Sequence, residues 1–116
     1  MIAPGQWAVA LKNISQGDAL VDADGILPPT LLAEVMAQTA GLAVAADMPE
    51  RRVALLVEID RFRCRRQVRA GEQLLVSARV LRRFGGNVKV RASIRAGRRW
   101  GAACELVLHF PPNSSR

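Results

Sequence analysis

The sequence predicts an α+β fold in which an antiparallel sheet wraps around one central helix. Residues 26–41 read ILPPTLLAEVMAQTAG, and apolar residues on all sides of such a helix indicate that most of its faces are buried. After Arg52, four segments alternate between apolar and polar side chains, with glycines between them. That alternation is typical of antiparallel strands joined by tight turns. One helix followed by such strands is the pattern of a sheet packed on a helix.

The first part of the chain predicts one short strand and two connecting segments. Residues 7–11 alternate weakly, which favours a short opening strand, and residues 15–18 predict a turn. Residues 22–29, DADGILPP, predict a loop. Gly25 permits unusual backbone angles there, and Leu27, which precedes a proline, prefers an extended conformation.

The predicted helix begins at Pro29 or Thr30 and ends near Asp47, before Pro49. It carries a single carboxylate near its start, Glu34, with leucine, valine and methionine around it in the sequence. Two interpretations of that carboxylate stand side by side. An acid in apolar surroundings is a candidate catalytic group, and an acid near a helix N-terminus is stabilised by the helix dipole.

Four strands are predicted after the helix, at residues 54–62, 74–84, 87–96 and 98–110. Their alternation places one face of the sheet on the core and the other in solvent. Glu105 and His109 fall on the solvent face of the last strand, so we expect His109 to be a surface or interface residue. Long strands with unpaired edges, next to a helix that is apolar all round, predict a homodimer or heterodimer.

Length and composition are those of one domain, residues 1–116, half of them hydrophobic. The sequence has neither a run of ~18–20 apolar residues nor a basic segment ahead of an apolar one, so we expect no membrane span, no signal peptide and a cytoplasmic protein. Cys64 and Cys104 lack zinc-binding or disulfide spacing and are expected to be packed thiols. A thiol nucleophile that uses His109 is the alternative.

The charge is distributed unevenly along the chain. Residues 1–60 hold three basic and eight acidic groups, a net charge of −5, whereas residues 61–116 hold fourteen basic and two acidic groups, a net charge of +12. Such a positive half predicts either an anionic partner or a solvated surface. Nucleic acid is the less favoured partner, because the chain has no tyrosine, three phenylalanines and two tryptophans. Phosphate-bearing carriers and acidic proteins fit the charge equally well.

The predicted helix segment LPPTLLAEVMAQTAG resembles a motif of the β-hydroxyacyl-acyl carrier protein dehydratases, Pro-Gly-x-Leu-x-x-Glu-x-Met-Ala-Gln-x-x-Gly. The similarity covers roughly residues 7–110 and continues through VEIDRFRCRRQVRAGEQL, which is like the family's Ile-Asp, Phe-x-x-x-Val and Gly-Asp-x-Leu stretch. The resemblance implies the hotdog fold, a sheet wrapped around a long helix. It also implies dimers or higher oligomers with acyl-thioester tunnels at the dimer interface, and no metal or cofactor.

The same resemblance identifies Glu34 as the family's helix acid and implies binding roles for the residues around it: Gly25, Pro28, Thr30 and Gln38. In active dehydratases a histidine lies about fourteen residues before the glutamate. Leu20 falls near that position here, within ALVDADG, and no histidine precedes His109. β-Elimination needs both a base and an acid, so independent dehydratase activity is doubtful.

One alternative and one further departure concern the groups around Glu34. Asp22 or Asp24 could supply the second catalytic group, although both are more simply turn residues. Proline replaces the family's glycine at Pro29 and has no amide hydrogen, so Thr30 would have to help hold a thioester oxygen.

Three functions remain as hypotheses. The first is a dehydratase-like subunit with incomplete catalytic machinery, which acts on acyl carrier protein or acyl-CoA thioesters and forms homodimers, higher oligomers or a heterodimer with a catalytic hotdog subunit. The second is a thioesterase that uses Glu34 alone. The third is a non-enzymatic module that binds an acyl chain or a carrier protein. Charge complementarity suggests a carrier-binding surface of arginines: Arg61, Arg63, Arg65, Arg66, Arg69, Arg82 and Arg83.

Overall fold

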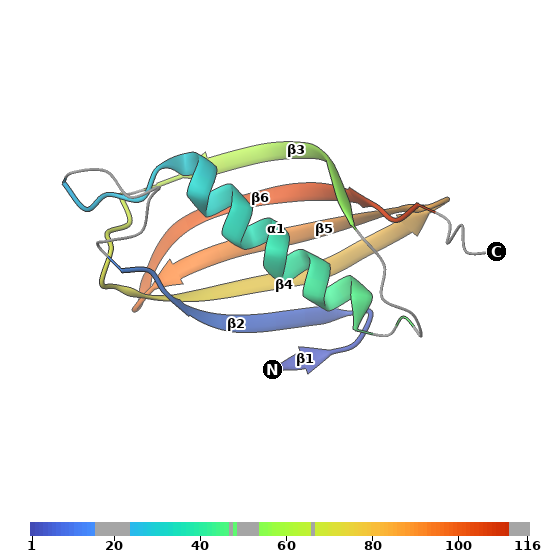
Figure 1. The fold of residues 1–116 in the computed structure, drawn as a ribbon, viewed down its shortest axis with the longest axis horizontal. Helices are drawn as coiled ribbons and strands as arrows, with labels where there is room; N and C mark the ends of the chain where they lie inside the picture. Colours follow the sequence, from blue (N-terminus) through green and yellow to red (C-terminus); the bar gives the residue numbers. More distant parts are fainter. Residues whose placement is uncertain (16–23, 47, 49–53, 66, 112–116) are drawn as a thin grey trace.

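The computed structural model describes residues 1–15, 24–46, 48, 54–65 and 67–111. One helix lies across one face of a six-stranded sheet (Figure 1). The elements in chain order are β1 (Ile2–Ala3), β2 (Trp7–Asn13), α1 (Pro29–Ala45), β3 (Leu55–Cys64), β4 (Gln73–Phe84), β5 (Asn87–Ala96) and β6 (Arg99–His109). The predicted fold class, an antiparallel sheet with a single helix, is confirmed.

The strands have the order β1-β2-β4-β5-β6-β3, and every neighbouring pair is antiparallel. β4, β5 and β6 form two consecutive hairpins with turns at Gly85 and Gly97, both with positive φ, as expected where tight turns need left-handed backbone. β3 precedes β4 in the sequence but pairs with β6 at the far side of the sheet. β1 and β3 are therefore the two edges.

The predicted element boundaries agree with the structure to within a few residues. The opening strand is longer than expected, because β2 continues to Asn13, and the two-residue β1 was not predicted. α1 begins at Pro29 and ends at Ala45. Asp47, and the predicted turn beyond Ser15, lie outside the described residues. No helix in the described part of the chain is long and apolar enough to span a membrane.

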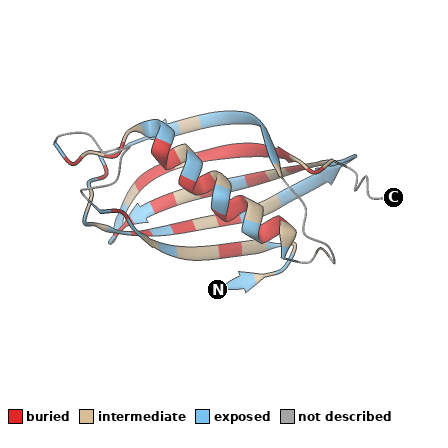
Figure 2. Ribbon diagram, in the orientation of Figure 1, coloured by how far each residue is buried: buried red, intermediate tan, exposed pale blue. Residues whose placement is uncertain are grey.

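The helix is not buried on most faces, and that part of the sequence prediction is wrong. Leu31, Leu32, Val35 and Met36 face the sheet and are buried, whereas Glu34 is exposed. Figure 2 shows buried and exposed residues alternating along α1. The reason is geometric: within one chain the sheet covers only one side of the helix, so the opposite side meets solvent, including apolar Leu42 beside polar Glu34 and Gln38.

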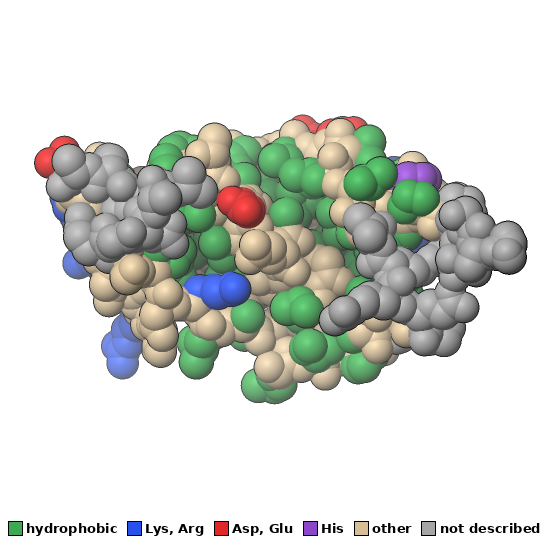
Figure 3. Space-filling model, viewed as in Figure 1, with side chains coloured by type: hydrophobic (Ala, Val, Ile, Leu, Met, Phe, Trp, Pro, Cys, Tyr) green, Lys and Arg blue, Asp and Glu red, His purple; other side chains and the backbone are tan. Residues whose placement is uncertain are grey.

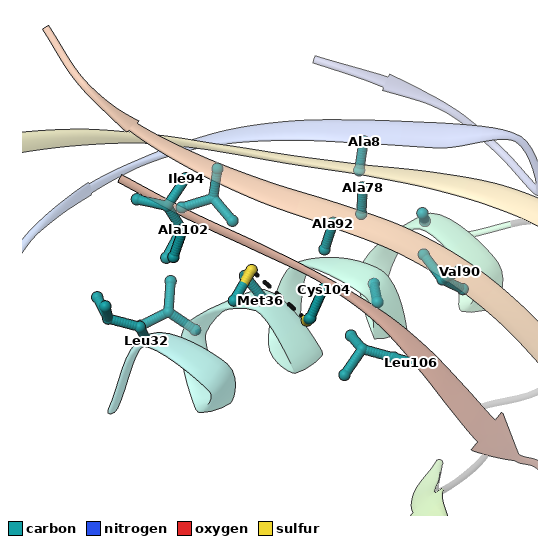
Figure 4. Close-up of a cluster of buried hydrophobic side chains, with 14 of the residues drawn as sticks. Ala8, Leu32, Met36, Ala78, Val90, Ala92, Ile94, Ala102, Cys104 and Leu106 are labelled. Atoms are coloured by element: carbon teal, nitrogen blue, oxygen red, sulfur yellow. Dashed lines mark hydrogen bonds between the residues drawn. The ribbon is translucent and has the colours of Figure 1, made fainter. Parts of the chain in front are cut away.

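The core forms where the buried side of α1 meets β4, β5 and β6 (Figure 4). Met36 and Cys104 lie at its centre, with the Cys104 thiol 3.7 Å from the Met36 sulfur. Burial, and secondarily the charge of Glu105, raises the pKa of the Cys104 thiol to about 11. A thiol that stays protonated is a poor nucleophile. The expectation of packed thiols holds for Cys104, while Cys64 on β3 is exposed.

Glu105 departs from the expectation of a solvated outer face, since only 8% of its surface is exposed. Its carboxylate oxygens lie 3.3 Å from Lys89 Nζ and 3.2 Å from Arg91 Nη2. Hydrogen bonds from Arg91 first, and then from Lys89, lower the pKa of the Glu105 carboxyl. The long side chains of Lys89 and Arg91 on β5 cover Glu105. The alternation of residues within β6 cannot reveal this cover, because it comes from another strand. His109 is half-buried, with its Nδ1 2.8 Å from Asn87 Oδ1.

Two glycine-to-alanine substitutions are expected to change stability in opposite directions. A Cβ at Gly101 would lie 3.0 Å from Val68 Cγ2 and 3.3 Å from the Ile94 carbonyl oxygen. We therefore expect Gly101→Ala to lower the free energy of unfolding by about 1–3 kcal/mol. A Cβ at Gly41, inside α1, meets nothing within 4 Å, so Gly41→Ala should raise it by about 0.5–1 kcal/mol. Urea denaturation measures both, and equal effects would contradict this packing.

Candidate functional site

An apolar groove, here called the helix groove, runs between the exposed side of α1 and β3. Its volume is about 520 Å³. Figure 3 shows hydrophobic side chains gathered along this face of the molecule, over α1 and β3. The residues that line it are Thr30, Ala33, Glu34, Ala37, Gln38 and Gly41 from the helix, Ala54, Leu56 and Ile59 from β3 and the segment before it, and Leu108 from β6.

The helix contributes a stripe of residues spaced at one turn. Thr30, Glu34 and Gln38 are four residues apart and therefore lie on one side of α1, and all three are exposed. Ala33, Ala37 and Gly41 also line the groove, and because they are small they leave space between the helix and β3. The helix thus presents one carboxylate and one carboxamide to an otherwise apolar channel.

The loop before the helix is fixed by backbone hydrogen bonds to the segment that precedes β4. Gly25 is buried with φ 77°, and its carbonyl accepts a hydrogen bond from the Ala70 amide at 2.7 Å. The Leu27 amide donates to the Val68 carbonyl at 2.8 Å. Gly25 therefore acts through the backbone, because it provides the turn that aligns the chain for Pro28 at the helix start.

The first turn of α1 leaves one amide available. Pro28 precedes the helix, and its carbonyl accepts hydrogen bonds from the amides of Leu31 and Leu32, at 3.0 and 3.2 Å. Pro29 has no amide hydrogen. The Thr30 amide has no acceptor within the part of the chain that the structure describes. It is therefore the amide in this turn that can hold an oxyanion.

Glu34 is the only ionisable side chain among the described residues that line the helix groove. It makes no ion pair and no side-chain hydrogen bond within the described part of the chain. Solvent reaches this carboxylate in the single chain, so Glu34 is not an acid enclosed by apolar side chains. Such a group can act as one base or one nucleophile, but not as an acid and a base together.

The structure does not bring His109 to Glu34. Leu108 lines the helix groove, and side chains alternate along β6, so His109 points to the other side of the sheet. Asp24 is exposed in the turn before Gly25, and its carbonyl oxygen accepts a hydrogen bond from Arg69 Nη1 at 3.2 Å. Leu20 and Asp22 lie outside the described residues.

One feature that sequence reasoning missed is the exposure of β3. Nine of its ten residues are exposed, Phe62 alone being half-buried. Its first half carries large apolar side chains that are 41–60% exposed: Leu55, Leu56, Val57 and Ile59. The signal was present in the sequence, since three consecutive apolar residues place apolar groups on both sides of a strand. An edge strand with this surface is a site for pairing with another chain.

The arginines predicted as one carrier-binding surface are spread over separate places. Arg63 and Arg65 line one hollow beside Trp100. Arg82 and Arg83 lie next to the β4–β5 turn, and Arg83 Nη2 donates to the Gly5 carbonyl at 3.2 Å. The others are divided as well. Arg61 is 4.0 Å from the Asp60 carboxylate, Arg69 belongs to the loop before β4, and Arg66 lies outside the described residues.

Metal binding finds no support in the described residues, which contain no group of three or more His, Cys, Asp or Glu side chains that could hold an ion. The groups that the helix groove offers are the Glu34 carboxylate, the Gln38 carboxamide and the Thr30 amide. These groups suit an uncharged carbonyl substrate with an apolar chain.

Comparison with known proteins finds relatives in sequence and solved structures of the same fold, although no protein-family model matches the chain. A 3-hydroxyacyl-[acyl-carrier-protein] dehydratase FabZ from Pelotomaculum thermopropionicum is 32% identical over 112 residues, which cover 91% of this chain and 79% of that protein. A second FabZ dehydratase, from Listeria welshimeri, is 28% identical over 94% of this chain and 78% of its own length.

Among solved structures, the dehydratase heterocomplex ApeI:P from Xenorhabdus doucetiae superimposes with a TM-score of 0.82. It is 17% identical, over 94% of this chain and 78% of that one. At this level of identity the likeness is one of fold, and the fold is the hotdog fold.

Proposed function

Because the chain belongs to the FabZ family of 3-hydroxyacyl-[acyl-carrier-protein] dehydratases, we propose that it is a dehydratase-like subunit that binds an acyl thioester in the helix groove. In this proposal Glu34 supplies one of the two catalytic groups, and a second hotdog subunit supplies the other. The observation that carries the proposal is that Glu34 is the only ionisable group lining the groove among the described residues.

The chemistry of dehydration explains why one group is not enough. Removal of water from a 3-hydroxyacyl thioester takes a proton from the α-carbon and adds a proton to the leaving hydroxyl. Glu34 can perform one of these transfers. The Thr30 amide would hold the thioester oxygen on which charge develops, and Gln38, one turn along the helix, would hydrogen-bond to the substrate. The apolar wall of Leu56, Ile59 and Leu108 suits the acyl chain.

The exposed edge β3 supports a second subunit at this place. A strand that pairs with β3 would continue the sheet and cover the apolar side chains of its first half. The same partner would close the open side of the helix groove, because Leu56 and Ile59 belong to both the edge and the groove. A group from the partner would then face Glu34. The related complex ApeI:P is a dehydratase heterocomplex, which supports a catalytic hotdog partner for this chain.

A thioesterase is the second candidate, favoured by the available Thr30 amide beside a single carboxylate. Hydrolysis of a thioester needs one base or nucleophile and an oxyanion donor, and the groove offers both within one chain. A probable thioesterase from Bartonella henselae shares the fold, with a TM-score of 0.77 at 11% identity over 96% of this chain and 95% of that one.

Turnover assays separate the two candidates. The purified chain is incubated with 3-hydroxyacyl and saturated acyl thioesters of carrier protein and of coenzyme A. It is assayed alone and mixed with a hotdog subunit that carries the catalytic histidine, and that second subunit is also assayed alone. The proposal predicts dehydration only in the mixture. Robust dehydration by the isolated chain contradicts the incomplete site. Hydrolysis by the isolated chain identifies the thioesterase instead.

Lysines introduced on the β3 edge are expected to prevent the association of subunits. Val57→Lys combined with Ile59→Lys should convert an oligomer into a monomer. The free energy needed to desolvate two ammonium groups at a strand-pairing interface exceeds the free energy that the pairing contributes. Light scattering coupled to size exclusion measures the mass. Leu11→Lys in β2, where the leucine is 61% exposed, serves as the matched control. A monomeric wild type, with or without the partner subunit, would contradict the edge interface.

A further inference from the structure

A basic groove, here called the outer groove, crosses the face of the sheet that points away from α1. Its floor is a row of small side chains, in which Ser77 lies opposite Ser93 and Ser93 lies opposite Ala103. On each of the three strands these residues alternate with side chains buried against the helix, which places the row on the outer face. Because the side chains in this row are short, they leave a hollow of about 520 Å³ above the sheet.

The walls of the outer groove are aromatic and cationic. Trp7 stands on the β2 side and Trp100 on the β6 side, and they are the only two tryptophans of the chain. The cationic lining residues come from three strands: Arg63, Arg79 and Arg91. The register places Arg79 opposite both Trp7 and Arg91. Arg79 and Trp7 are therefore cross-strand neighbours on this side of the groove.

A second hollow, of about 600 Å³, continues the groove toward the end of β3. It shares Arg63 and Trp100 with the first hollow and adds Arg65, Arg95 and Cys64. The Arg65 guanidinium lies 5.9 Å from the centre of the Trp100 ring, a cation–π contact that orients both side chains. The two hollows together combine both tryptophans with five arginines.

The positive charge of the outer groove is largely uncompensated. Within the described part of the chain, the side chains of Arg63, Arg79 and Arg95 make no ion pair or hydrogen bond. Arg91 shares the Glu105 carboxylate with Lys89. A second copy of this face would bring like charges together, which opposes association. An anion is the occupant that the charge favours.

We propose that the outer groove binds a nucleotide, with the base stacked on a tryptophan and the phosphates held by the arginines. Guanidinium groups match phosphate oxygens with paired hydrogen bonds, and an indole ring offers a flat surface for any nucleobase. The hydroxyls of Ser77 and Ser93 on the floor can hydrogen-bond to the sugar or phosphate. The volume is that of a small-molecule site. This site is separate from the helix groove, because the sheet lies between the two.

The tryptophans provide a direct test. Since both line the outer groove, their emission reports its occupancy without a label. ATP is titrated into the whole protein at physiological ionic strength, beside adenosine, tripolyphosphate and a single-stranded oligothymidylate, and calorimetry repeats each titration independently of fluorescence. The proposal expects ATP to saturate the emission change and to bind at least about tenfold more tightly than adenosine or tripolyphosphate, because base and phosphate both contribute.

Variants locate the site. Arg63→Gln and Arg79→Gln are each expected to weaken ATP binding about tenfold, through the loss of a charge-assisted hydrogen bond. Arg98→Gln removes the same charge from an exposed position outside both hollows and should leave the affinity unchanged. An equal loss of ATP affinity in all three variants would mean that binding depends only on the overall positive charge, and so would tripolyphosphate binding as tightly as ATP. Either result overturns the proposal. Oligothymidylate binding far more tightly than ATP overturns it in favour of a nucleic acid strand. No binding overturns it outright, whatever the outcome of the thioester assays.

Discussion

Glu34→Gln is expected to lower the turnover of acyl thioesters by about 10²–10⁴-fold in whichever assembly is active, with little change in KM or stability. A positioned general acid or base contributes an acceleration of that size. The carboxamide keeps the shape of the carboxylate but cannot accept the proton. Stability should be preserved because Glu34 is exposed and makes no side-chain contact that the fold requires within the described residues.

The matched control for this experiment is Glu72→Gln, which removes one carboxylate outside the groove. Glu72 Oε1 accepts a hydrogen bond from the Arg69 amide at 2.8 Å, and glutamine retains that oxygen. We expect this variant to keep full turnover, measured by mass spectrometry of the carrier-bound products. If the Glu34→Gln subunit supports full turnover in the complex, then Glu34 is not catalytic and the chain serves only to stabilise its partner.

Leu32→Ala is expected to lower the free energy of unfolding by about 3 kcal/mol, within the ~2–5 kcal/mol range for fully buried leucines. Leu32 is 0% exposed and lies in the core cluster with Met36 and Leu106 (Figure 4). The lost methyl groups leave a cavity that rigid neighbouring strands cannot fill. A loss of this size is a large fraction of the stability of a domain of this length.

Leu42→Ala on the same helix provides the comparison, because Leu42 is 52% exposed. A surface truncation of this kind changes the free energy of unfolding by about 0.5 kcal/mol. Chemical denaturation of both variants gives the difference directly. Similar losses at the two positions would mean that Leu42 is buried too, either by a second subunit in a tight oligomer or by a different packing of α1 in the single chain. Repeating the measurement in the Val57→Lys, Ile59→Lys monomer decides between these two explanations.

The order and type of the main elements could be predicted because local patterns specify them. The proline pair marks the start of α1, and glycines at Gly85 and Gly97 mark the hairpin turns that separate β4, β5 and β6. The family motif around Glu34 also lies within one continuous segment. Features that depend only on short-range spacing were therefore visible in the sequence.

The environments of single residues could not be predicted, because they depend on neighbours far away in the sequence. Glu105 is covered by side chains from β5. Glu34 is exposed because the sheet covers only one side of α1. Both tryptophans, nearly the whole chain length apart, meet in one groove with arginines. A low count of aromatic residues disfavours a stacking ligand only when those residues are scattered, and the fold brings these two together.

The sequence by itself determined the family, the single helix, the antiparallel strands and the place of Glu34 on the helix, since all of these depend on patterns of neighbouring residues. Only the tertiary structure decided which faces are covered. β3 is an exposed edge because it pairs with β6 and with no other strand among the described residues, and the helix groove is open because no second layer in the described chain covers α1. Burial is a property of the whole packing, and here the packing of one chain leaves its site half-enclosed.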